Sequence, residues 1–208
     1  MIKKLQALKA KKGFTLVELV VVIAIIGVLA AILVPTMLGV VQDSRITSAN
    51  STAQQVKDRT TEFLTKMDAA KASYKAATTE ATISVDDGVW TLTTTSTEGS
   101  GDWLDGKDHW GESADTKEGE LENKDTMYIE YIADSLSDLK TAYIVVYIKA
   151  GKVVGVASVD GATEFDTVPD AAAFQAGSWE GFTGKAGVVN NVVVGTSPAL
   201  TTAEAAAA

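Results

Sequence analysis

The stretch that decides the fold is KKGFTLVELVVVIAIIGVLAAILVP, residues 11–35. Residues 19–34 form an apolar run in which Gly27 alone contributes no side chain. The apolar character extends over residues 14–41, which contain a single charge, Glu18. A helix needs about 20 consecutive apolar residues to cross the hydrocarbon core of a bilayer. The segment therefore predicts one membrane-spanning helix close to the N-terminus.

The residues in front of this segment predict its orientation. They include no acid and five lysines, namely Lys3, Lys4, Lys9, Lys11 and Lys12. The positive-inside rule keeps such an end in the cytoplasm and sends the rest of the chain outward. After residue 41 no small-residue cleavage site of an ordinary secretory signal follows. An uncleaved signal anchor leaves Glu18 unexplained, because a carboxylate in the bilayer core costs about 2.5–3.5 kcal/mol.

Composition excludes several classes of protein. The 208-residue chain is 46% hydrophobic and 22% charged, which fits one membrane segment on a soluble domain. Its formal net charge of −9 repels phosphate, so nucleic-acid binding by bulk charge is not expected. With no cysteine and a single histidine, His109, neither a disulfide nor a multi-histidine metal site can form. Sequence motifs of enzymes such as a P-loop, GxSxG or HExxH are absent as well, and we expect no catalysis.

The segment Lys11-Lys12-Gly13-Phe14-Thr15-Leu16-Val17-Glu18, followed by the apolar run, resembles the N-terminus of a type IV pilin or related pseudopilin. The resemblance implies that a prepilin peptidase cuts between Gly13 and Phe14 and methylates the new N-terminal amine. The glutamate, glycine and helix-breaking proline of that family match Glu18, Gly27 and Pro35. It also implies self-assembly into a helical homopolymer on a pilus assembly platform.

The chemistry of Glu18 can be argued independently. After the cut, Glu18 lies about 6 Å along the helix from the cationic amine of Phe14. In an apolar helix bundle a charge pair is favoured over a lone charge. We therefore expect the Phe14 amine of a neighbouring subunit to neutralise Glu18 and to set the register between subunits. The alternative is a glutamate that is merely tolerated at the interface.

Pro35 is expected to kink or break the helix, because it lacks an N–H and its ring opposes the carbonyl of Ala31. Gly27 is a second weak point, costing about 1 kcal/mol relative to alanine. The resemblance implies that residues 28–34, between Gly27 and Pro35, can lose their helical conformation and become extended in a filament. For the isolated subunit we expect a kinked membrane helix.

Beyond residue 41 the apolar residues become a stripe. They recur in steps of three and four, which predicts one face of a helix, at Ile46, Ala49, Ala53, Val56, Thr60, Phe63, Met67, Ala70 and Tyr74. This set is the helix seam. Neither Pro nor Gly occurs between residues 40 and 77, so a single helix from residue 14 to about 77 is expected. A coiled coil is an alternative, but the β-rich segment that follows favours packing on a sheet.

The remaining chain predicts strands at 81–85, 89–95, 127–132, 142–149, 152–159 and 188–194. Asp86-Asp87-Gly88 and Ala150-Gly151 are turn signals for two hairpins. Ala142, Ile144, Val146 and Ile148 should face the helix, with the tyrosines and valine between them on the other face. The fold class is α+β: a long N-terminal helix packed by its C-terminal half on an antiparallel sheet, which is the pilin fold.

The domain organisation follows from these segments. We expect a cleaved leader at 1–13, a transmembrane and assembly half of the helix at 14–41, an amphipathic half at 42–78, a β-rich head at 79–196 and a low-complexity tail, frayed or disordered, at 197–208. Because the chain has no cysteine, it departs from the C-terminal disulfide of Gram-negative pilins. A Gram-positive or anaerobic source, or other contacts that close the C-terminal region, would account for the missing disulfide.

Two further groups of residues have alternative interpretations. Ten acids crowd residues 98–125, and Asp102, Asp105 and Asp108 are potential calcium ligands. Their spacing does not match an EF-hand, so a solvated loop with no metal or cofactor is expected. The tryptophans could stack on a polysaccharide or anchor loops internally; they are Trp90, Trp103, Trp110 and Trp179.

The functional prediction is a structural subunit of a type IV pilus, serving adhesion or motility. Its partners would be other copies of itself, the prepilin peptidase, the assembly platform and, as a monomer, the membrane. The subunit pool would lie in the cytoplasmic membrane of a bacterium and the assembled pilus on the cell surface. The alternatives are a pseudopilin of a type II secretion or DNA-uptake system and an adhesive minor pilin.

Overall fold

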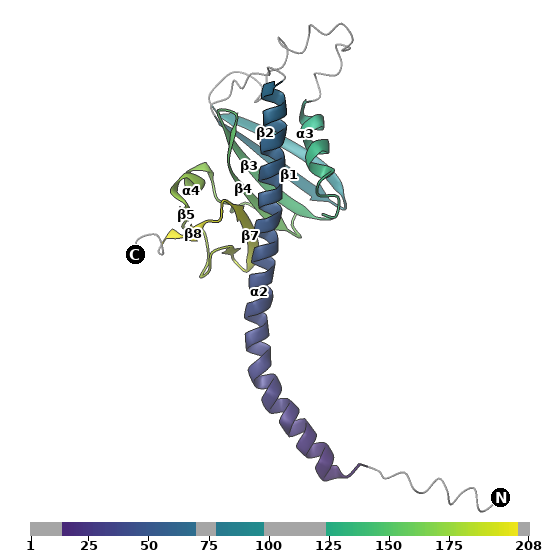
Figure 1. Ribbon diagram of the computed structural model, residues 1–208. Helices are drawn as coiled ribbons and strands as arrows, with labels where there is room; N and C mark the ends of the chain where they lie inside the picture. The colour runs from purple at the N-terminus through teal and green to yellow at the C-terminus, as the bar shows by residue number, and fades with distance from the viewer. Residues whose placement is uncertain (1–13, 70–77, 98–123, 204–208) are drawn as a thin grey trace, which may run out of the picture. The chain divides into compact units, whose positions relative to one another are not determined.

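The computed structural model describes residues 14–69, 78–97 and 124–203. The chain divides into two compact units, Met1–Asp43 and Ser44–Ala208, which are described separately. The first consists of the N-terminal part of helix α2 (Leu16–Ala69). The second holds the rest of α2 and the sheet (Figure 1).

Helix α2 begins two residues later than predicted and is described as far as Ala69. The predicted extension over 70–77 lies outside the described residues. The helix continues through Pro35, so the alternative of a break is wrong. The next residue, Thr36, donates its hydroxyl to the carbonyl of Leu33 at 2.9 Å, which adds a side-chain hydrogen bond to the turn that contains the proline.

The second unit contains a six-stranded antiparallel sheet in the order β2-β1-β3-β4-β7-β6. Its strands are β1 (Thr78–Asp86), β2 (Val89–Thr97), β3 (Ala142–Lys149), β4 (Lys152–Asp160), β6 (Val188–Val189) and β7 (Val192–Ser197). A parallel pair is formed by β5 (Ser178–Trp179) and β8 (Thr201–Thr202). The described residues of this unit also include two short helices, α3 (Lys124–Ala133) and α4 (Ala171–Ala176). The α+β class of the pilin fold is confirmed.

Both predicted hairpins are confirmed. Asp87 and Gly88 join β1 to β2, and Ala150 and Gly151 join β3 to β4, all four with positive φ. This backbone conformation gives two-residue turns whose twist matches that of the strands. The predicted single strand over 188–194 is wrong, because it is a third hairpin, β6–β7. Its turn residues are Asn190 and Asn191, which also have positive φ, a conformation that asparagine tolerates well.

The predicted strand over 127–132 is wrong, because these residues lie in helix α3. In this segment, MYIEYI, Glu130 is the one charged residue, and so short a run of mostly apolar residues does not distinguish a strand from a helix. Tyr128 and Ile132 are both fully buried and four residues apart, which puts them on one helix face. The burial pattern thus follows the helical period rather than the strand period.

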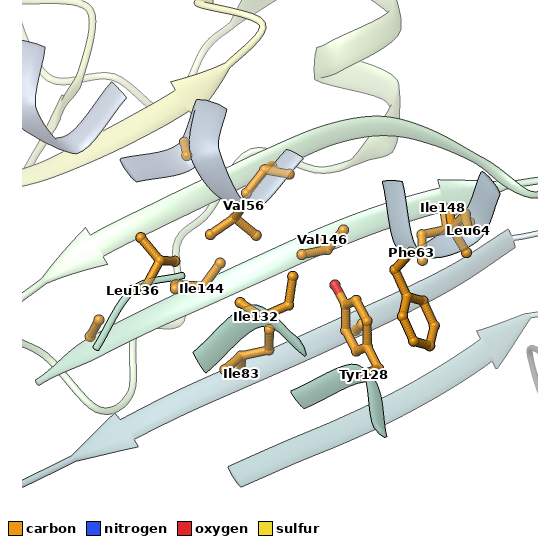
Figure 2. Close-up of a cluster of buried hydrophobic side chains, with 14 of the residues drawn as sticks. Val56, Phe63, Leu64, Ile83, Tyr128, Ile132, Leu136, Ile144, Val146 and Ile148 are labelled. Carbon is orange, nitrogen blue, oxygen red and sulfur yellow. The ribbon is translucent and has the colours of Figure 1, made fainter. Parts of the chain in front are cut away.

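Two apolar layers cover the two faces of the sheet. On one face Ile144, Val146 and Ile148 pack against α2 and α3, as the alternation in β3 predicts (Figure 2). On the other face the intervening Val145 and Tyr147 lie beneath Phe174 of α4 and neighbouring C-terminal residues. The sheet is therefore buried on both sides where β3 runs, and β3 has more buried residues than any other described strand.

The prediction of a disordered tail from residue 197 is wrong for residues 197–203. Ser197 ends strand β7, and Leu200 is buried in the apolar layer beneath α4. Thr201 donates its backbone N–H to the carbonyl of Gly177 at 3.1 Å, where β8 pairs with β5. One buried leucine and one strand bridge thus attach a segment whose composition resembles a linker. Residues 204–208 lie outside the described part.

Candidate assembly site

The first unit presents an apolar helix surface. The large apolar side chains from Phe14 to Val41 are between 45% and 84% exposed, and they surround the whole helix. Gly27 also has no atom within 4 Å of where a Cβ would lie. The helix is long and apolar enough to cross a membrane. A helix that is apolar on all sides needs lipid or other helices around it.

Glu18, the single charge in this segment, is engaged by its own chain. Its Oε2 accepts the backbone N–H of Thr15 at 2.9 Å and the Thr15 hydroxyl at 2.6 Å. The backbone N–H of Glu18 in turn donates to Thr15 Oγ1 at 3.2 Å. This reciprocal pattern is a capping box, which satisfies the free N–H groups at a helix start. It explains why the helix begins at Leu16 and leaves Phe14 outside it.

Thr15 was not singled out from the sequence as a site residue. The signal for it was present, because Thr15-Leu16-Val17-Glu18 has the spacing of a threonine and a glutamate in a capping box. Within the single chain, therefore, the Glu18 carboxylate already accepts hydrogen bonds from two donors. A neighbouring amine would compete with these hydrogen bonds or add to them.

The structure places the helix seam against the sheet and α3. Six of its residues are buried, namely Ala49, Ala53, Val56, Thr60, Phe63 and Met67. Ile46 is half-buried, and Ala70 and Tyr74 lie outside the described residues. Leu64 is also buried although it stands beside the stripe rather than on it, and it belongs to the same buried cluster as Ile148 (Figure 2).

Helix α3 widens the buried face of α2 around Phe63. The Phe63 ring lies 5.2 Å from that of Tyr128 and 5.8 Å from that of Tyr131, measured between centroids. The hydroxyls of Tyr128 and Thr60 are 2.8 Å apart, and Thr60 donates to the carbonyl of Val56. The Tyr128 hydroxyl is therefore the donor to Thr60. Burial raises the pKa of Tyr128.

A second group of contacts holds the C-terminal strand β7 on α2. We call it the C-terminal clamp: Asn50 and Gln54 on the helix, with Gly195, Thr196 and Ser197 on the strand. Asn50 Oδ1 accepts the backbone N–H of Thr196 at 2.8 Å, and Gln54 Oε1 accepts the Ser197 hydroxyl at 2.5 Å. A Cβ at Gly195 would overlap the carbonyl group of Ala49, so glycine permits this close approach.

The other candidate residues are placed as follows. Trp90 is half-buried against the layer that contains α3, and Trp179 is half-buried near α4. Trp103, Trp110, His109 and the potential calcium ligands Asp102, Asp105 and Asp108 lie outside the described residues. Within the described ranges no group of three acids or histidines is arranged to hold a metal ion.

Comparisons with known proteins match both parts of the chain. A family model described as a domain of unknown function, DUF5021, matches residues 46–201. A model of the prokaryotic N-terminal methylation motif matches residues 8–34. Two fimbrial proteins of Pseudomonas aeruginosa are each 46% identical over 50 residues, which are 24% of this chain. No solved structure matches the chain significantly.

The chain spans about a third, 32%, of the length of these curated relatives. The match of residues 46–201 covers well over half of the chain and is centred on the second unit. The methylation motif covers Gly13, Phe14 and Glu18, the residues on which the pilin resemblance rests. The chain therefore belongs to the DUF5021 family and carries the N-terminal signal of the type IV pilin superfamily.

Proposed function

We propose that the chain is a structural subunit of a type IV pilus, serving adhesion or motility. The observation that carries the proposal is the apolar segment of α2, exposed on all sides over residues 14–41, with one carboxylate near its start. Such a surface is stable only in lipid or among other apolar helices. A subunit that moves from membrane to filament meets both environments in turn.

Insertion and processing form the first step of the proposed function. The five N-terminal lysines hold the leader, residues 1–13, on the cytoplasmic side. A prepilin peptidase then cuts between Gly13 and Phe14 and methylates the new amine. The match to the N-terminal methylation motif supports this step. The chain is thus the substrate of an enzyme, and we assign it no catalysis of its own.

Polymerisation is the second step. Removal of the leader places a cationic amine on Phe14, close to the Glu18 carboxylate of an adjacent subunit. In an apolar bundle an unpaired carboxylate is costly, and an incoming amine stabilises it. The Thr15 hydrogen bonds hold the carboxylate at the start of the helix, where such an amine arrives. Gly27 and Pro35 are proposed to let residues 28–34 adapt as helices pack together.

The second unit carries its own apolar core and is proposed to form the filament surface. Its part of α2 is buried against the sheet through Val56, Phe63 and other seam residues. This core does not depend on the exposed apolar residues of segment 14–41. The head can therefore stay folded while that segment exchanges lipid for neighbouring helices.

Deletion of the gene tests the function in the producing bacterium. Surface filaments should disappear, attachment or surface spreading should fall, and the intact gene should restore both. Loss of protein secretion or DNA uptake with no loss of long filaments would instead identify a pseudopilin. Sheared filaments should contain the chain as their main component, and its absence from them would contradict the proposal.

A further inference from the structure

An open pocket of about 290 Å³ lies in the second unit. Trp179 and Thr202 in its lining belong to the paired strands β5 and β8, which are labelled in Figure 1. Its lining residues are Trp179, Glu180, Phe182, Gly184, Thr202 and Ala203. Thr202 and Ala203 come from the segment that composition alone predicts to be disordered. The pocket therefore exists because β8 attaches this segment to β5. Its volume lies just below the range of about 300–1,000 Å³ that is usual for small-molecule sites.

The indole of Trp179 is held firmly in this pocket. Its ring meets Phe182 edge to face, with 5.0 Å between centroids and an interplanar angle of 88°. A Cβ at Gly181 would overlap the six-membered ring of the Trp179 indole. Glycine at this position therefore lets the backbone lie directly against that ring. Trp179 nevertheless remains half-exposed. A rigid, partly exposed indole offers apolar contact area at a low cost in conformational entropy.

Polar groups flank the indole within the same pocket. Glu180 is exposed and its carboxylate is an acceptor only, whereas the Thr202 hydroxyl is both a donor and an acceptor. Hydrogen bonds to an ionised carboxylate are shorter and stronger than neutral ones. The carboxylate also disfavours anionic ligands, and the acceptors beside the indole can receive hydrogen bonds from the hydroxyl groups of a neutral molecule.

We propose that the pocket of Trp179, Glu180 and Thr202 binds a neutral hexopyranose unit of a polysaccharide. A pyranose ring with equatorial hydroxyls has an apolar face of C–H groups, which would stack on the indole of Trp179. Its hydroxyls at the ring edge would donate to Glu180 and exchange hydrogen bonds with Thr202. Binding at this site does not depend on filament assembly.

The test is titration calorimetry of the full-length chain in detergent micelles. The probes are neutral tetrasaccharides of glucose, N-acetylglucosamine or galactose, with tetragalacturonic acid as the anionic control. At least one neutral probe should bind, and the anionic control should bind more weakly or not at all. Failure of every neutral probe to bind, or tighter binding of the anionic one, would overturn the proposal.

Variants then locate the site. Trp179→Ala should weaken binding by about tenfold or more, as loss of a central aromatic contact does. Gly181→Ala should also weaken it, because the added Cβ displaces the indole without removing a lining side chain. Glu180→Ala, at an exposed residue, should keep the fold and still weaken binding. Glu164→Ala, an exposed acid outside the pocket, is the matched control.

The control variant should bind as the unchanged chain does. Circular dichroism of Trp179→Ala separates lost binding from lost folding. If Glu180→Ala and Gly181→Ala both bind like the unchanged chain, the sugar does not occupy this pocket and the inference is wrong. Either result leaves the proposed pilus function untouched, since that function is measured as filaments on cells.

Discussion

The side chain of Asn50 and the backbone of Thr196, 146 positions apart in the chain, are joined by a 2.8 Å hydrogen bond. The bond attaches the last strand of the sheet to the amphipathic part of α2. Gln54 and Ser197 repeat the attachment one helical turn further along. In a chain without cysteine, these polar contacts and the close approach of Gly195 hold the C-terminal region in place.

Removing the helix side of the clamp should therefore destabilise the head. Asn50→Ala leaves the N–H of Thr196, a buried residue, without its acceptor, and such a loss costs about 1–3 kcal/mol. Urea unfolding of the full chain in micelles, followed by tryptophan fluorescence, measures the change. The matched control is Gln55→Ala on the exposed face of the same helix, expected to cost less than about 0.5 kcal/mol. Equal effects of the two changes would contradict the role of the clamp.

The strand side of the clamp has its own test. A Cβ at Gly195 meets the backbone of Ala49 and Asn50, which cannot swing aside as a flexible side chain can. Gly195→Ala should therefore push β7 away from α2 and cost about 1–3 kcal/mol. The same unfolding measurement applies, and an unchanged unfolding midpoint would show that the strand and helix are not held closely together.

Assembly should depend on Glu18 more than on its local partner. Glu18→Ala and Glu18→Val should leave the subunit in the membrane and cleaved, yet strongly reduce pilus number, because no carboxylate remains to pair with an incoming amine. Thr15→Ala removes the capping hydroxyl but keeps that carboxylate, so this variant should form more filaments than either Glu18 variant does. Electron microscopy of cells and blots of sheared material measure both. If the two kinds of variant assemble equally poorly, Glu18 acts through the helix cap instead.

Processing gives a direct prediction at the leader. Sheared filaments should begin FTLVE, because cleavage after Gly13 exposes Phe14. N-terminal sequencing and the intact mass of the subunit check this, and the mass should also reveal a methyl group. Recovery of Met1 from assembled filaments would contradict cleavage.

Features of the fold that depend on residues close together in the chain could be predicted from the sequence, and features that depend on distant residues could not. The membrane segment and the hairpins at Gly88 and Gly151 follow from local composition and turn chemistry, and these predictions hold. Helix α3 was missed because MYIEYI is too short and too uniformly apolar to show a period, whereas the burial of Tyr128 and Ile132, four residues apart, follows that of a helix. The clamp and the ordered residues after Ser197 depend on partners far away in the chain, which no local pattern indicates.

Within the head, the helix seam should supply much of the stability. A fragment lacking residues 1–41 retains the seam and the sheet, and should be soluble, monomeric and folded. In it Phe63→Ala should cost about 3–5 kcal/mol, because Phe63 is buried against Tyr128. Lys66→Ala is the comparison. The ammonium group of Lys66 donates to the Tyr131 hydroxyl at 2.8 Å and forms an ion pair with Glu62 at 3.1 Å. Because both contacts are exposed to solvent, Lys66→Ala should lower the free energy of unfolding much less than Phe63→Ala does. Equal effects would mean that the buried face is assigned wrongly.

Alkaline pH should weaken the head through its buried tyrosines. Burial raises the pKa of Tyr128 above that of an exposed tyrosine, about 10 in an unfolded chain. Above that pH the unfolded chain loses a proton that the folded one keeps, so stability is full below about pH 10 and falls as the pH rises further.

Tyr128→Phe removes the titrating group and the hydrogen bond to Thr60. The variant should be about 1 kcal/mol less stable at neutral pH and should lose less stability between neutral and alkaline pH. Burial also raises the pKa of Tyr147, so part of the alkaline loss should remain in the variant. Thermal melts of both proteins across this range measure the difference, and parallel curves would show that Tyr128 does not titrate on unfolding.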